Sequence, residues 1–183
     1  HLLRYITYLN ENYPKVLDID VFKEIVRHPT DRKKPEPIDL CTKYEYAIET
    51  IYTHCRAQIL GWSTSSPPKI IEYMDFGFGS GKKTRYMTDK LRADNIAHKA
   101  FGYDIDNWSN FDRKKQLRKY QNKEKYPMEI SIGKPDEPLP YHNGQFAIVS
   151  AYYVLHHIKN ITRAIAELAR VIMPNGYLII LEH

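Results

Sequence analysis

Three glycines at alternate positions follow an aspartate and an apolar run near the middle of the chain. Residues 75–81 read Asp-Phe-Gly-Phe-Gly-Ser-Gly, directly behind the apolar residues 70–74. Glycine removes the side chain that would keep a ligand from the backbone, and it permits positive φ where the chain must bend sharply. A helix beginning near Lys82 would present unpaired N–H groups and its positive dipole end to an anion. The segment therefore predicts a strand, a glycine turn and a helix that approach a nucleoside ligand closely.

A second acidic residue, Asp104, ends the next apolar segment, residues 100–104. An ionised carboxylate only accepts hydrogen bonds, so Asp104 suits the two hydroxyls of a ribose. Asp106 lies beyond the expected strand end and is the weaker candidate. A capping or surface role for Asp104, and a glycine turn that binds nothing, are the alternatives. A nicotinamide dinucleotide is disfavoured, because its GxGxxG fingerprint needs a glycine where this chain has Lys82.

Apolar segments and helical patterns alternate from residue 70 onward. Strands are predicted at 70–74, 100–104, 128–132, 146–150 and 177–181. Helices are predicted over about 82–93 and along a stripe from Ile161 to Ile172, capped by Asn160 and stopped by residues 174–176. This alternation predicts an α/β fold, in which a doubly wound, mostly parallel sheet carries helices on both faces.

The first third of the chain follows a different pattern. Two short helices are expected within residues 1–28, a charged proline-containing linker over 29–37 and a longer helix over about 43–60. We therefore expect an N-terminal helical extension and linker over residues 1–68 and the sheet core over residues 69–183.

The glycine loop led by Asp75 resembles motif I of class I S-adenosylmethionine-dependent methyltransferases. Residues 139–141, 143–146, 154–158 and 174–178 are similar to that family's LPF, DxxFD and VLHHI stretches and its PGG turn. The resemblance covers roughly residues 69 to 183 and implies a Rossmann-like core that uses S-adenosyl-L-methionine. It implies cofactor contacts from the following residues: Asp75, Gly77, Phe78, Gly79, Gly81, Asp104, Ile105, Asp136, Ser150 and Ala151.

The family's pattern gives some of these residues particular parts of the cofactor. Its motif I acid lies near the methionine part, which Ser150 and Ala151 would also line. The family often carries Gly-Asp after the third strand, whereas residues 133–137 shift that pair, so Asp136 is the candidate for the adenine amino group. The end of the fourth strand lacks the Asp of ribose-2′-hydroxyl RNA methyltransferases, which disfavours that chemistry.

Three residues after the fourth strand are candidates for the substrate side: Tyr152, Tyr153 and His156. Tyr152 and Tyr153 would stack on a flat substrate, with core packing as an equal alternative. His156 is a candidate general base, but a packing and hydrogen-bonding role is favoured for His156 and its neighbour His157.

The charge of the chain favours an anionic partner. The net charge is +5, and residues 112–125 form its most basic stretch, which Arg32, Lys33 and Lys34 would extend. A guanine ring nitrogen needs no general base, and no convincing base is found. We therefore expect methyl transfer to RNA, and the cap guanine is one such acceptor. A small-molecule acceptor, and a non-catalytic S-adenosylmethionine-binding module of a larger polypeptide, are the alternatives.

Size and composition set the remaining expectations. A chain of 183 residues suffices for one domain with a core. Its two cysteines, Cys41 and Cys55, match no metal-site spacing, so no metal and a reducing, cytoplasmic location are expected. No membrane span is predicted. The chain begins at His1 and stops just after its fifth strand, without the two further strands of the usual seven-stranded sheet. The rest of a longer polypeptide, or a partner, is expected to cover the strand from Tyr177 to Leu181.

Overall fold

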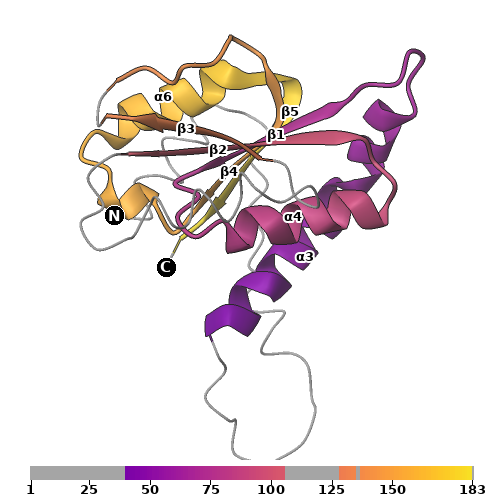
Figure 1. Ribbon diagram of the computed structural model, residues 1–183, viewed down its shortest axis with the longest axis horizontal. Helices are drawn as coiled ribbons and strands as arrows, with labels where there is room; N and C mark the ends of the chain where they lie inside the picture. The colour runs from indigo at the N-terminus through magenta and orange to yellow at the C-terminus, as the bar shows by residue number, and fades with distance from the viewer. Residues whose placement is uncertain (1–39, 106–127, 135–136, 183) are drawn as a thin grey trace, which may run out of the picture. The chain divides into compact units, whose positions relative to one another are not determined.

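The computed structural model of the 183-residue chain describes residues 40–105, 128–134 and 137–182 (Figure 1). The compact unit that contains the sheet runs from Asp39 to His183. The helices expected within residues 1–28, the linker 29–37, the basic stretch 112–125 and Asp136 all lie outside the described residues.

Five parallel strands form one sheet in the order β3-β2-β1-β4-β5. They are β1 (Ile71–Phe76), β2 (His98–Ile105), β3 (Met128–Gly133), β4 (Phe146–Tyr152) and β5 (Ile172–Leu181). The strand order reverses between β1 and β4, and open sheets of this kind bind ligands at the carboxyl ends of the strands beside such a reversal. The predicted doubly wound, Rossmann-like fold class is confirmed.

The helices cover both faces of the sheet. Helix α4 (Lys82–Ala93) joins β1 to β2, and α6 (Ile161–Val171) joins β4 to β5. The two crossovers run in opposite directions from the centre of the sheet, and the right-handed connection that such units adopt then puts the two helices on opposite faces. Figure 1 shows α6 on one side and α4 on the other, with α3 (Leu40–Ser63) beside α4.

Helix α3 is tied by polar contacts to α4 and to β5. The Tyr52 hydroxyl donates to Asp94 at 2.6 Å, and the Arg56 guanidinium pairs with the same carboxylate at 2.6 Å. Near the end of α3, Gln58 accepts a hydrogen bond of 2.7 Å from the Tyr177 hydroxyl. Helix α3 therefore belongs to the same packed body as the sheet.

Alternation along β1 decides which of its side chains reach the site. Met74 and Phe76 pack into the cluster that contains Leu168 of α6. Successive strand residues point to opposite faces, so Asp75 points toward α4, where it contacts Thr84. The packing of Met74 and Phe76 thus fixes the orientation of the Asp75 carboxylate between them.

The junction between α6 and β5 differs from the prediction. The helical stripe predicts that Ile172 belongs to α6, but it has φ −79° and ψ 135° and is the first residue of β5. Pro174 disfavours helical geometry at the residue before it and has no N–H to donate back to Arg170. The Arg170 carbonyl instead accepts from Gly144 N at 2.9 Å. The β4–β5 register shifts between Phe146 and Ile148, so the 174–176 turn lies within an irregular strand.

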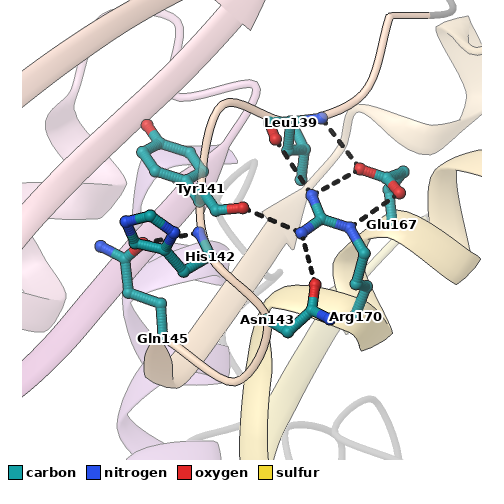
Figure 2. Close-up of polar contacts among 7 residues, drawn as sticks. All are labelled: Leu139, Tyr141, His142, Asn143, Gln145, Glu167 and Arg170. Atoms are coloured by element: carbon teal, nitrogen blue, oxygen red, sulfur yellow. Dashed lines mark hydrogen bonds and ion pairs between the residues drawn. The ribbon is translucent and has the colours of Figure 1, made fainter.

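Arg170, in the last turn of α6, holds the segment that leads into β4 (Figure 2). Its guanidinium donates to Glu167 through Nε and Nη2, to the Leu139 and Tyr141 carbonyls, and to Asn143 Oδ1, at 2.8–3.0 Å. An arginine has five N–H donors, and these contacts use all five. Hydrogen bonds from Arg170 lower the pKa of Glu167. This cluster fixes the start of β4, and thereby the position of its far end at the candidate site.

Candidate functional site

The glycine loop after β1 has the backbone conformation that its sequence predicts. Gly77, Gly79 and Gly81 have φ of 72°, 51° and 69°. A Cβ at Gly77 would lie 2.3 Å from Val154 Cγ2, whereas one at Gly79 would meet nothing closer than the Gly77 carbonyl oxygen at 3.9 Å. Gly77 is therefore required by packing. Gly79 leaves open space, in which a ligand can approach the backbone.

Asp75 lies beneath this loop and is 1% exposed. Thr84 of α4 donates to it at 2.5 Å, and Ser150 of β4 donates at 2.8 Å. The Ser150 hydroxyl also lies 2.8 Å from the Tyr73 hydroxyl. Burial raises the pKa of Asp75 to about 6, although the two hydroxyl donors and the nearby Lys83 favour the ionised form. Asp75 thus joins β1, β4 and α4 at the base of the loop.

Asp104, at the end of β2, contacts the glycine loop directly. Its Oδ2 accepts from Gly79 N at 3.1 Å, and its Oδ1 accepts from Ile105 N at 2.8 Å. The structure therefore brings together the two features that the sequence analysis named separately, the alternate-glycine loop and the carboxylate after the second strand. A carboxylate only accepts hydrogen bonds and has about four acceptor positions, which is the chemistry that a diol requires.

Phe78, inside the loop, is 7% exposed. A Cβ at Gly102 of β2 would lie 2.9 Å from Phe78 Cδ1, so the Phe78 ring lies against the backbone of β2. Its side chain anchors the loop, and the loop presents its backbone to the crevice.

The end of β4 lies under the same edge of the sheet. Ser150 and Ala151 are both 0% exposed, and the Ser150 hydroxyl is directed to Asp75. Tyr152 is 2% exposed, so its ring has no face on which a substrate could stack, and core packing describes it. Tyr153 is half-buried and has φ of 54°. Tyr153 is therefore the remaining aromatic candidate for the substrate side.

His156 is exposed, and its Nδ1 lies 2.7 Å from Glu182 Oε2. The other oxygen of Glu182 accepts from the backbone N–H groups of Val154 and Leu155 at 2.9 and 2.7 Å. The rings of His156 and His157 lie 4.0 Å apart, centroid to centroid. For His156 the structure thus displays the hydrogen-bonding role that the sequence analysis favoured, with Glu182 as the organising group.

Three residues at this edge were not named from the sequence: Lys83, Thr84 and Glu182. The first two lie in the first turn of α4, and the third directly follows β5. Only their positions in the chain could have indicated them. The first turn of a helix that follows a glycine loop lies at the ligand-binding edge of the sheet, and so does the residue after a parallel strand.

Residues 74–180, which include the glycine loop and the ends of β2 and β4, match the profile of the methyltransferase domain family. The chain belongs to this family. Its members are class I S-adenosylmethionine-dependent methyltransferases, as the resemblance predicted.

Solved structures show the same fold as this methyltransferase domain. The DszA carbon methyltransferase matches with a TM-score of 0.59 at 17% identity, over 80% of this chain and 36% of that chain. A putative sarcosine dimethylglycine methyltransferase from Galdieria sulphuraria matches with a TM-score of 0.58 at 18% identity, over 81% and 50%. The chain thus spans half or less of the length of these two proteins. No curated protein sequence matches it.

The polar groups at this edge of the methyltransferase domain fit S-adenosylmethionine, the cofactor of the family. The Asp104 carboxylate at the end of β2 suits the ribose hydroxyls. The open backbone at Gly79 suits the adenosyl group, and the half-buried ammonium of Lys83 suits a carboxylate on the ligand. No group of three His, Cys, Asp or Glu side chains gathers as metal ligands in the described part of the chain. Nor does any helix in that part have the length and apolarity to cross a bilayer.

Proposed function

We propose that this chain binds S-adenosylmethionine at the carboxyl ends of β1, β2 and β4 and transfers its methyl group. The observation that supports the proposal is the contact of the Asp104 carboxylate with Gly79 N, because a group that can accept from ribose hydroxyls then lies beside open glycine backbone. Asp104 would hold the ribose hydroxyls. Asp75, Ser150 and Ala151 would support the methionine part, and Asp136 would reach the adenine.

When bound, the cofactor supplies a methyl group on a sulfonium, which is an excellent leaving group. The protein then chiefly has to hold the acceptor atom in line and exclude water, and such positioning supplies much of a rate enhancement. Tyr153, which directly follows β4, and His156, in the short 3-10 helix Leu155–His157, are the side chains that we assign to the acceptor side.

We propose RNA as the acceptor class, and the cap guanine as the first acceptor to test. The support is the net charge of +5 and the basic stretch over residues 112–125. A small-molecule acceptor is the second candidate, supported by the half-buried aromatic ring of Tyr153. We further propose that another segment or a partner covers β5, because within the described residues β5 pairs only with β4.

Isothermal titration with S-adenosylmethionine, followed by a radiolabelled methyl assay on capped RNA and on small acceptors, tests the proposal. Asp104→Asn is the matched variant, since it removes the charge while preserving size. We expect binding and transfer by the native chain, with both reduced in Asp104→Asn. Binding without transfer to any acceptor would indicate a non-catalytic cofactor-binding module. Absence of binding would overturn the proposal.

A further inference from the structure

Lys83, the second residue of α4, carries an ammonium into the candidate site. Its Nζ donates to the Tyr152 carbonyl at the end of β4 at 3.1 Å. The same Nζ lies 4.9 Å from the centroid of the Tyr153 ring. These contacts hold the ammonium at the β4 side of the sheet edge. The preceding lysine, Lys82, is exposed.

Lys83 is half-buried, which increases the benefit of an anion beside its ammonium, and two carboxylates already act on it. Burial lowers its pKa, while the carboxylates of Asp75 and Glu182 favour its charged form. An ammonium has three donors. Within the described residues, the hydrogen bond to the Tyr152 carbonyl uses one of them. The others can reach a ligand without any loss of the existing contact.

The start of α4 supplies a second, independent preference for an anion. Gly81 is the N-cap residue, and α4 has neither a side-chain cap nor an acidic residue in its first turn. The first N–H groups of a helix have no intrahelical partner, and its dipole is positive at that end. The ammonium of Lys83 and the uncapped end of α4 therefore act on the same region.

Strand order separates this region from the ribose position. Asp104 lies at the end of β2, on one side of β1, and the Lys83 contacts lie at the end of β4, on the other side. A ligand whose ribose lies at Asp104 and whose amino-acid end crosses β1 would bring that end to Lys83. Resting on the function proposed above, we propose that Lys83 binds the α-carboxylate of the cofactor's methionine part.

The experiment compares two ligands that differ only in that carboxylate. S-adenosylhomocysteine has it, and S-adenosyl-3-thiopropylamine keeps the amine but lacks it. In isothermal titration of the full chain, we expect the native protein to prefer S-adenosylhomocysteine by about 10- to 100-fold, as for a charge-assisted hydrogen bond. Lys83→Met removes that preference by weakening S-adenosylhomocysteine alone. The matched control Lys82→Met retains it.

A second variant separates charge from folding. Lys83→Arg keeps a cation and is expected to retain most of the preference, so a loss in Lys83→Met with retention in Lys83→Arg supports the assignment. If Lys83→Met retains the full preference, Lys83 only links α4 to β4 through its hydrogen bond to the Tyr152 carbonyl, and the inference is overturned. If the native chain binds neither ligand, the proposed function fails, and this inference fails with it.

Discussion

Asp75→Asn is expected to stabilise the folded chain at neutral pH. Asp75 is 1% exposed, and burial raises its pKa from 3.8 to about 6. A shift of about 2 units at about 1.36 kcal/mol per unit corresponds to roughly 3 kcal/mol between the two protonation states. Asparagine resembles the protonated acid and can still bond with Thr84 and Ser150. The variant therefore avoids the cost of the buried charge.

The pH dependence of this gain has a fixed sign. Because folding raises the pKa of Asp75, the folded state binds the proton more tightly than the unfolded chain does. The free energy of unfolding of the native protein therefore falls as pH rises from about 4 to about 6. Above about pH 6 the contribution of Asp75 to that free energy stays constant. The asparagine variant lacks this loss. Its advantage in unfolding free energy should be about 1 kcal/mol at pH 4.5 and up to about 3 kcal/mol at pH 8.

Urea unfolding of both proteins at these two pH values measures the difference. Asp89→Asn, which makes the same charge change at a 40% exposed side chain of α4, is the control and should shift stability by less than about 0.5 kcal/mol. An asparagine variant less stable than the native chain at pH 8, or an advantage of equal size at both pH values, would refute the reasoning.

Four further substitutions test separate parts of the account. Gly77→Ala should destabilise the fold by about 2 kcal/mol or more in urea unfolding, because its Cβ would lie 2.3 Å from Val154 Cγ2 at a φ of 72°. Gly79→Ala meets open space, so it should cost only about 1 kcal/mol of stability but weaken S-adenosylhomocysteine at least about tenfold by titration; equal affinity would argue against ligand approach there. Asp104→Asn should weaken the same ligand by about 10- to 100-fold, and an unchanged Kd would remove the ribose assignment. Arg170→Lys should lower the free energy of unfolding by about 2 kcal/mol, and with it Tm, because an ammonium cannot replace five directed donors. An unchanged Tm would show that the cluster is dispensable.

The sequence predicted the elements that depend on local chemistry. Helix α4 has the predicted bounds, Lys82–Ala93, because glycine precedes it and its apolar residues recur at helical spacing. Asn160 caps α6 as predicted, accepting from Arg163 N at 3.1 Å. The five-strand parallel sheet followed from the alternation of strands and helices.

The features that the sequence did not predict depend on residues far apart in the chain. Ser150 donates a hydrogen bond to Asp75, which lies 75 positions earlier in the chain, so residue spacing could not predict this contact. The burial of Tyr152 is likewise set by the sheet packing around it. Ile172 lies in the strand rather than the helix: Pro174 cannot donate to the Arg170 carbonyl, and the N–H that does so belongs to Gly144, 26 positions earlier in the chain.

A crystal structure of the chain grown with saturating S-adenosylhomocysteine tests the central claim most directly. The account predicts adenosine over the backbone of Gly79, with both ribose hydroxyls within hydrogen-bond distance of the Asp104 carboxylate. An empty crevice at saturating ligand, or a nicotinamide dinucleotide bound there in preference, would contradict it.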